Sequence, residues 1–239
     1  MSVSAVVPME SNPEVFTELA HKIGLSSVLA FNDVYSLTDP DLLSFIPRPC
    51  FAIILLFPIT EFYETERKRI DSQSSELYSE FGENEKVLWF KQTIKNGCGL
   101  YALLHSIGNI NDEYLQKDST IYNFFKEAKN LNVKERADLV QVLEKSYSSL
   151  ANQGQTEAPE ALDDVSLHFI SFVKSFKNDH VYELDGRRNS PIDLGQSISP
   201  ENTDVLLEKN IIDKIQYYMD NADEANKYNF SMMALVPSF

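Results

Sequence analysis

Residues 92–106 read QTIKNGCGLYALLHS, and the rest of the chain is organised around this stretch. A polar turn flanked by glycine delivers Cys98 to the first turn of an apolar helix. The start of a helix presents unpaired backbone N–H groups and the positive end of the helix dipole. A thiol placed there has its thiolate favoured, which lowers its pKa and suits a nucleophile. The alternative is an inert buried cysteine, a common state of free cysteine, and the local pattern alone leaves both interpretations open.

Length and composition restrict the class of protein. The 239 residues are 43% hydrophobic, with 15 Phe and 11 Tyr, enough for a substantial core in one large domain or two small ones. The net charge of −15 argues against nucleic-acid or anionic-membrane binding, which need basic surface. It fits a basic partner or simply high solubility. The apolar run 51–57 is shorter than the ~20 residues that span a bilayer. Residues 1–9 lack the basic and apolar regions of a secretory signal, so we expect a reducing compartment and no disulfide between Cys50 and Cys98.

Hydrophobic periodicity predicts helices and strands in mixed order. Helices are expected over 13–23, 119–130 and 132–150 and within 202–221, and strands over 50–58, 165–173, 180–185 and 228–236. The strand over 50–58 is continuously apolar, which predicts burial on both faces. Residues 61–85 are charged and polar, which predicts an exposed connection with at most a helical turn. A loop over 151–161 is long enough to be functional or disordered.

A thiolate nucleophile needs a base, a group that orients the base, and an oxyanion hole. His168 and Asp185 flank a predicted hairpin whose turn centres near residues 176–177. That register places the two residues opposite each other on one face, with Cβ atoms about 5 Å apart. Asp185 would then hold one imidazole nitrogen while the other faces the thiol. A slip of one residue would break this arrangement, and the alternative is a surface His–Asp pair.

The other histidines are predicted to be structural. His105 follows Cys98 by seven positions, roughly 10 Å along the helix, which is too far to reach the sulfur. His21 lies on an amphipathic helix, where a surface or packing role is expected, and His180 is expected at the exposed end of a strand. Cys50 begins a buried strand and is expected to pack inertly.

Gln92 precedes Cys98 by six residues and has two interpretations. Its side-chain amide and the Cys98 backbone N–H can point at the same space and form an oxyanion hole. Loss of one such donor typically costs about 2.7–4 kcal/mol of transition-state stabilisation. The alternative is a glutamine that only stabilises the turn.

Together these residues resemble the ubiquitin C-terminal hydrolases, a papain-like group of cysteine peptidases, and most of all its small single-domain fungal members. The resemblance covers nearly the whole chain. Besides 92–106, it rests on MESNPE at 9–14, PRP at 47–49, AIILLFP at 52–58, HFI at 168–170 and ELDGR at 183–187. It implies an α/β (α+β) fold with a central antiparallel sheet flanked by helices and a knotted backbone, in a single catalytic domain over 1–239. It also implies that residues 151–163 form a crossover loop, which limits access to the active site to thin, flexible chains.

The resemblance assigns roles to individual residues. Cys98 is expected to be the nucleophile, His168 the general base and later acid, Asp185 the orienting carboxylate and Gln92 the oxyanion donor. Gly97 stands where the family usually has Ala or Ser. A glycine loosens the turn, and we expect a small effect on the positioning of Cys98.

The implied activity is thiol-dependent hydrolysis of small adducts, esters, thioesters or short peptides from the C-terminal glycine of ubiquitin. No cofactor and no metal are implied, and ubiquitin is the expected partner of a cytoplasmic monomer. Carboxylates of the acidic chain suit the arginines of the ubiquitin tail. The residues expected to pack on ubiquitin are Val7, Pro8, Met9, Glu10, Ser11 and Asn12.

Three alternatives remain open. The first is a non-catalytic ubiquitin-binding module in which Gly97 has spoiled the site. The second is the same hydrolysis acting on a related ubiquitin-like modifier. The third, a general papain-like endopeptidase, is disfavoured because the crossover loop should exclude folded substrates.

Overall fold

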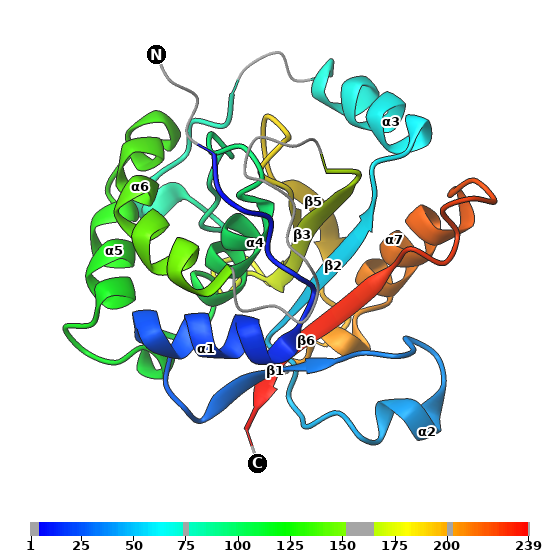
Figure 1. Cartoon of the computed structure of the whole chain (residues 1–239), viewed down its shortest axis with the longest axis horizontal. Coiled ribbons are helices and arrows are strands. Elements are labelled where there is room, and N and C mark those ends of the chain that lie inside the picture. The colour runs from blue at the N-terminus through cyan, green and yellow to red at the C-terminus, as the bar shows by residue number, and fades with distance from the viewer. Residues whose placement is uncertain (1–4, 74–76, 152–164, 200–202, 239) are drawn as a thin grey trace.

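A six-stranded sheet forms the centre of the molecule in the computed structural model, which describes residues 5–73, 77–151, 165–199 and 203–238 (Figure 1). Its strand order is β1-β6-β2-β3-β4-β5, and every neighbouring pair is antiparallel. The strands are β1 (Leu29–Asp33), β2 (Ala52–Pro58), β3 (Leu167–Lys174), β4 (His180–Leu184), β5 (Ile192–Gln196) and β6 (Ser231–Pro237). The predicted fold class, an antiparallel sheet flanked by helices, is confirmed.

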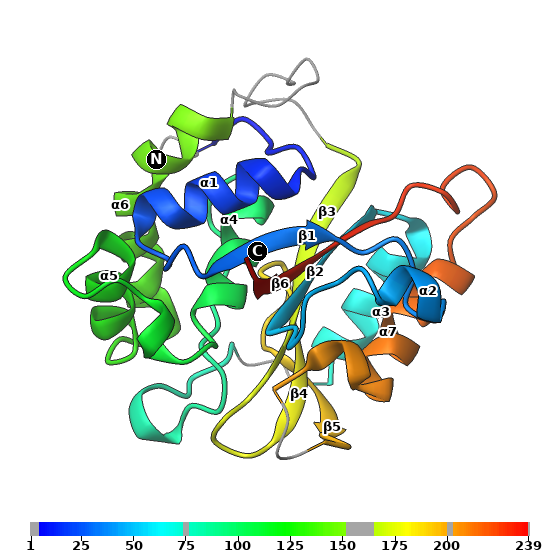
Figure 2. The ribbon, with the colours of Figure 1, turned by 90° about the horizontal axis from the view of Figure 1, so that it is seen from below.

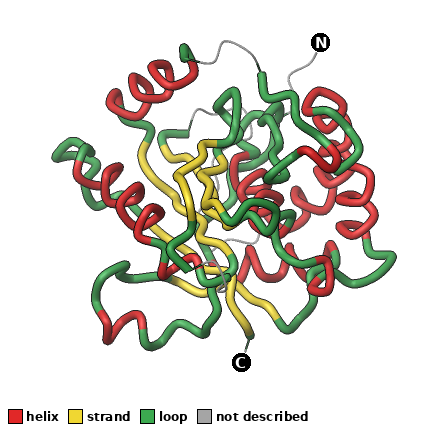
Figure 3. Tube along the Cα trace, turned by 180° about the vertical axis from the view of Figure 1, so that it is seen from behind, coloured by secondary structure: helices red, strands yellow, loops and turns green. Residues whose placement is uncertain are grey.

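Helices cover both faces of the sheet (Figures 1 and 2). They are α1 (Pro13–Ile23), α2 (Pro40–Leu43), α3 (Glu61–Asp71), α4 (Cys98–Ile107), α5 (Thr120–Ala128), α6 (Val133–Ala151) and α7 (Lys209–Asp220), with short 3-10 helices η1 (Gly82–Asn84), η2 (Asp112–Tyr114) and η3 (Val205–Leu207). Helices α1, α4, α5 and α6 pack on one face and share one hydrophobic core. Helices α3 and α7 pack on the other face around a second core. Figure 3 shows the same layers from behind.

Strand β2 separates the two cores. Ala52 and Ile54 face the core with α4, whereas Ile53, Leu55 and Phe57 face the core with α3 and α7. Successive side chains of a strand point to opposite faces, so a continuous apolar run is the pattern of a strand covered on both sides. The predicted burial of this strand on both faces is confirmed.

Helix α1 begins and ends as its sequence predicts. The Asn12 side chain accepts a hydrogen bond of 2.9 Å from the backbone N–H of Glu14, and Pro13 occupies the first turn. Gly24 ends the helix with a left-handed φ of 119°, and its N–H bonds back to the carbonyl of Ala20. The cap residues therefore set both boundaries of this helix.

The prediction of an exposed connection over 61–85 is wrong for residues 61–71, which form α3. Thr60 caps this helix by accepting a bond from the Tyr63 N–H, and Arg67 and Arg69 each pair with a glutamate three residues earlier. Tyr63 is the only fully buried residue of α3. A helix stabilised by caps and surface pairs, with one buried side chain, carries almost no apolar periodicity.

Strands β1 and β5 are also absent from the sequence prediction. Both have five residues and both lie at an edge of the sheet. No residue of β5 is fully buried, so its sequence lacks a strand pattern. The predicted crossover loop at 151–163 lies outside the described residues except for Ala151, which ends α6. Over the described ranges, none of the helices combines the length and the apolarity needed to cross a membrane.

Candidate active site

Cys98 is the first residue of α4, and the turn before it aims its thiol. Asn96 has a left-handed φ of 59°, and Gly97 caps the helix with φ −79° and ψ 3°. The Gly97 N–H donates to the carbonyl of Ile94 (3.2 Å), which closes the turn. All residues of α4 are buried, because the helix packs against the centre of the sheet, and Cys98 itself is 7% exposed. The predicted placement of a cysteine at the start of an apolar helix is confirmed.

His168 on β3 and Asp185 directly after β4 form a buried pair. The imidazole Nε2 lies 2.7 Å from Oδ1 of Asp185, and the exposed fractions are 2% for His168 and 1% for Asp185. His168 also lies near enough to Cys98 for each side chain to shift the pKa of the other. Because Nε2 is held by the carboxylate, Nδ1 is the ring nitrogen left for the sulfur. The structure thus brings together the three residues that the sequence singled out.

The hairpin achieves this with a register that differs from the predicted one. Ser171 pairs with Leu184, so the next pair along places Asp185 opposite Ile170 and not opposite His168. The turn centres one residue later than predicted, and Asp179 adopts a left-handed φ of 56° within it. The shift changes the residue opposite Asp185 from His168 to Ile170. Side chains alternate between the two faces of a sheet, so His168 and Ile170 point to the same face, and His168 stays on the face of Asp185. His168 and Asp185 are therefore diagonal neighbours on one face.

Asp185 receives more partners than the sequence predicts. The Tyr63 hydroxyl donates to Oδ2 at 2.6 Å, the Arg187 backbone N–H donates to Oδ1 at 2.8 Å, and Arg188 Nε lies 3.8 Å from Oδ2. Burial alone would raise the pKa of this carboxyl. The charges of His168 and Arg188 and the hydrogen bonds outweigh burial and hold the pKa well below its usual range. Asp185 is therefore a fixed carboxylate at neutral pH.

The electrostatics of the pair favour a charged state. Burial would lower the pKa of His168, but the Asp185 carboxylate, aided by the contact with Cys98, raises it to about 9. Burial would raise the pKa of Cys98, but the hydrogen bond and charge of His168 lower it below its ordinary value. The two shifts have opposite signs, and both favour the thiolate–imidazolium form of the pair.

Gln92 is braced beside this site. Its Nε2 donates to the carbonyl of Ile94 (3.1 Å), and its backbone N–H donates to the carbonyl of Gly186 (2.8 Å). A Cβ added at Gly186 would lie 2.9 Å from the Gln92 Cβ, so the close packing of residue 186 against Gln92 requires glycine. The Oε1 atom is buried without a partner among the described residues. An amide carries two N–H donors, and the bond to Ile94 leaves one of them available to an oxyanion.

The remaining histidines have structural contacts, in agreement with the sequence predictions. His105 is buried, its Nε2 accepts from the Phe90 N–H at 3.0 Å, and burial lowers its pKa to about 4. His21 Nε2 bonds to the Leu29 carbonyl at 2.7 Å. His180 pairs with Asp193 at 2.8 Å at the partly exposed end of β4.

Cys50 differs from Cys98 in its surroundings and in the direction of its pKa shift. Its side chain is fully buried, its thiol donates to the Ala52 carbonyl at 3.2 Å, and burial raises its pKa. Both cysteines are free. An inert packing role for Cys50 agrees with the sequence prediction.

The N-terminal segment runs beside the turn that carries Cys98. The Val6 N–H donates to the Lys95 carbonyl at 3.1 Å, and the Tyr147 hydroxyl donates to the Val7 carbonyl at 3.0 Å. Met9 is 5% exposed and packs against Gly99, the residue after Cys98. Its side chain therefore supports the start of α4.

The other residues of this segment are half-buried. Pro8 and Glu10 follow the chain toward α1, Asn12 caps that helix, and Ser11 Oγ lies 2.9 Å from Ser231 Oγ. Glu10, Ser11 and Asn12 line a polar hollow of about 450 Å³. Their predicted contact with ubiquitin stays a prediction.

A buried Cys–His–Asp arrangement with a lowered thiol pKa defines the class of thiol hydrolases. The sequence profile described as "Ubiquitin carboxyl-terminal hydrolase, family 1" matches residues 6–220, and the chain belongs to this family. It is 43% identical to ubiquitin carboxyl-terminal hydrolase YUH1 of Saccharomyces cerevisiae, over 98% of this chain and 97% of the relative. It is 35% identical to a probable ubiquitin carboxyl-terminal hydrolase of Dictyostelium discoideum, over 96% and 87% of the two chains.

A solved structure shares the fold. The UCH37 catalytic domain of Trichinella spiralis, bound to ubiquitin vinyl methyl ester, superposes with a TM-score of 0.72 at 22% identity. The match covers 100% of this chain and 97% of that domain. It supports the papain-like assignment of the fold.

Proposed function

We propose that this protein is a thiol-dependent hydrolase that removes small adducts, as esters, thioesters or short peptides, from the C-terminal glycine of ubiquitin. The observation that carries the proposal is the buried contact of 2.7 Å between His168 and Asp185, on an imidazole that lowers the pKa of the Cys98 thiol. Family membership supplies the substrate class, because the relatives are named ubiquitin carboxyl-terminal hydrolases.

The proposed reaction has two stages. The Cys98 thiolate attacks the carbonyl of the terminal glycine, while Asp185 holds the His168 imidazolium in place. The resulting oxyanion accepts hydrogen bonds from the Gln92 amide and the Cys98 backbone N–H. His168 then donates its proton to the departing amine, alcohol or thiol, and a thioester forms. In the second stage His168 takes a proton from water as the water attacks the thioester. The bond between the Cys98 sulfur and the carbonyl then breaks, which regenerates the thiolate–imidazolium pair and releases ubiquitin with a C-terminal carboxylate.

Recognition of ubiquitin is assigned to surfaces near this site. The exposed parts of residues 7–12 are the proposed contact on the N-terminal side, and residues 151–163 are the proposed crossover loop. Both cysteines are free, which fits a reducing compartment, and we propose a cytoplasmic location. We further propose that residues 1–239 act as one catalytic domain and as a monomer, without a nucleic-acid or membrane partner.

Covalent labelling tests the proposal. Ubiquitin that carries a C-terminal vinyl methyl ester is expected to add to the wild-type protein, and peptide mass spectrometry should locate the adduct at Cys98. Cys98→Ser should give no adduct, and Cys50→Ser, which removes the other thiol, should label like the wild type. A folded wild-type protein that gives no adduct at Cys98 would contradict the proposal.

The same preparation separates the alternatives. A non-catalytic ubiquitin-binding module would bind ubiquitin tightly without turning over a fluorogenic ubiquitin substrate. A preference for a ubiquitin-like modifier would appear when the two modifiers compete for one enzyme sample. Cleavage of casein would indicate a general endopeptidase.

A further inference from the structure

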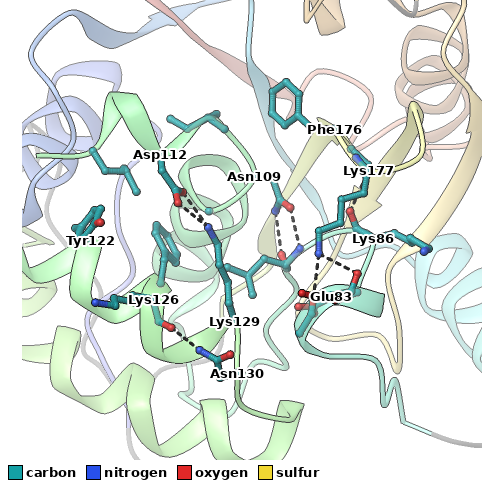
Figure 4. Close-up of a pocket in the computed structure, with 18 of the residues that line it drawn as sticks. Glu83, Lys86, Asn109, Asp112, Tyr122, Lys126, Lys129, Asn130, Phe176 and Lys177 are labelled. Carbon is teal, nitrogen blue, oxygen red and sulfur yellow. Dashed lines mark hydrogen bonds and ion pairs between the residues drawn. The ribbon is translucent and has the colours of Figure 1, made fainter. Parts of the chain in front are cut away.

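A hollow of about 500 Å³ lies at the end of α4 opposite to Cys98 (Figure 4). Four segments line it: residues 82–88, residues 108–115 after α4, residues 122–130 of α5 and just beyond, and residues 174–177 of the β3–β4 turn. Helix α4 has ten residues, so its two ends are roughly 15 Å apart. This hollow is therefore separate from the Cys–His–Asp site.

The lining of the hollow concentrates positive charge in an acidic protein. The chain has 36 acidic and 21 basic residues. Five of the basic residues lie here, namely Lys86, Lys126, Lys129, Lys174 and Lys177, against the three carboxylates of Glu83, Glu85 and Asp112. Two of the carboxylates are already occupied. Arg136 binds Glu85 at 2.6 and 2.7 Å, and Lys129 binds Asp112 at 2.9 Å.

Two lysines keep their charge available. Within the described part of the chain, the Lys126 ammonium has no hydrogen-bond or ion-pair partner. Lys177 Nζ donates to the backbone carbonyls of Gly82 (3.0 Å) and Glu83 (3.4 Å), and no carboxylate of the described residues pairs with it. In Figure 4, Lys129 and Lys177 reach toward the middle of the hollow and Lys126 lies beside Tyr122, whereas Lys86 extends outward. Positive charge is thus presented on opposite sides of the opening.

Between these lysines the surface is apolar. Leu88, Ile110, Leu115 and Phe125 are buried in the floor, and Tyr122 is half-buried at one side. Phe176 stands at the upper edge in Figure 4 with 55% of its surface exposed. A large exposed aromatic side chain beside an apolar hollow is typical of an interaction site.

We propose that this hollow binds an acidic peptide segment of a partner protein. Carboxylates of the segment pair with Lys126 and Lys177, and apolar side chains of the segment pack against Tyr122 and Phe176, which lie at different sides of the hollow (Figure 4). A compact phosphate fits less well, because the described lining offers no arginine fork and α4 ends here with its negative dipole end. Carboxylates spaced along a peptide reach the lysines at the rim without approaching that helix end.

Fluorescence anisotropy with a labelled peptide of glutamates around one Leu and one Phe tests the proposal. Binding to the wild-type protein should weaken as salt rises, because exposed charges are screened. A matched peptide with Gln in place of Glu should bind at least about tenfold more weakly, which corresponds to about 1.4 kcal/mol. Lys126→Glu breaks no hydrogen bond or ion pair between described side chains and should weaken binding by about threefold to tenfold. The double variant Lys126→Glu/Lys177→Glu should weaken it further. Lys68→Glu is the same change at an exposed lysine of α3 that pairs with no carboxylate among the described residues, and this variant should bind as the wild type does.

Each outcome supports or overturns the assignment. Absence of binding, equal binding of the Glu and Gln peptides, or equal losses in Lys126→Glu and Lys68→Glu would overturn it. Displacement of the peptide by inorganic phosphate at constant ionic strength would replace it with a small-anion site. Turnover of a fluorogenic ubiquitin substrate should stay unchanged in Lys126→Glu, since the hollow is remote from Cys98, and this readout keeps the inference independent of the proposed catalytic function.

Discussion

The hydroxyl of Tyr63 donates a hydrogen bond of 2.6 Å to Oδ2 of Asp185, the carboxylate whose other oxygen holds His168. The Tyr63 ring also packs edge-on against Phe57, 4.9 Å between centroids, and is 1% exposed. A single residue of α3 thus anchors that helix to the sheet and fixes the orienting carboxylate. The position of Asp185 depends on α3 as well as on the β3–β4 hairpin.

Tyr63→Phe should lower kcat about tenfold and leave KM nearly unchanged. The phenyl ring keeps the packing, but a buried carboxylate loses a donor, and hydrogen bonds to charged groups contribute roughly 1.5–3 kcal/mol. Steady-state hydrolysis of a fluorogenic ubiquitin substrate measures the effect. Tyr78→Phe is the matched control, since the Tyr78 hydroxyl bonds to Glu80 at the surface at 3.3 Å. Equal kcat in Tyr63→Phe and the wild type would show that the bond to Asp185 does not position the base.

Cys98 should react with iodoacetamide at pH values below the ordinary thiol pKa. His168 lowers the pKa of Cys98, so the thiolate persists as pH falls and protonates only below the ordinary midpoint. The alkylation rate against pH, followed by peptide mass spectrometry, should give this lowered midpoint, and His168→Asn should move it upward. Cys50 is an internal control, because its burial and raised pKa predict no alkylation of the folded protein. Identical midpoints with and without His168 would contradict the ion pair.

Asp185→Ala should reduce kcat/KM by about 10²–10⁴-fold. The Asp185 charge is the leading influence that raises the pKa of His168 to about 9, so its removal lowers that pKa and frees the imidazole to rotate. The basic limb of the pH–rate profile, set by loss of the His168 proton, should therefore move to lower pH. Asp193→Ala removes the acid of the partly exposed His180 pair and should leave the profile in place. A basic limb that does not move in Asp185→Ala would refute this account of His168.

Gly97→Ala should change kcat/KM by no more than about threefold. Gly97 has φ −79°, which alanine adopts freely, so the turn does not require glycine for its backbone. An added Cβ would lie 3.2–3.3 Å from atoms of Ile94 and Tyr101, which is tight and needs adjustments of a few tenths of an ångström. The same hydrolysis assay measures the change. A loss above thirtyfold, in a variant with wild-type thermal stability, would show that the turn cannot accept a side chain.

The face shared by His168 and Asp185 was predictable, although their exact register was not. The alternation of a strand has a period of two, so an error of two residues in the pairing leaves both side chains on the same face. Cys98 was predictable for a similar reason, since an apolar run after a glycine-flanked turn specifies a buried helix start. These inferences rest on local periodicity and survive small errors of boundary.

Tyr63 and Gly186 were not predictable from the pattern. Tyr63 lies in a charged segment, and its role comes from a contact with a residue 122 positions later in the chain. Gly186 matters because two segments approach closely, which no local pattern encodes. The buried Arg136–Glu85 pair is similar, since each residue alone looks like a surface charge. Thr60 caps the first turn of α3, and this residue type at that position could have predicted where the helix begins.

The central claim is that Cys98 is the nucleophile of a ubiquitin C-terminal hydrolase, and single-turnover hydrolysis of a ubiquitin C-terminal amide tests it most directly. Wild type and Cys50→Ser should release the fluorophore at the same rate and pass through a ubiquitin thioester that acid quench can trap. Cys98→Ser should bind ubiquitin but release no fluorophore. Release by Cys98→Ser, or none from folded wild type that binds ubiquitin, would contradict the claim.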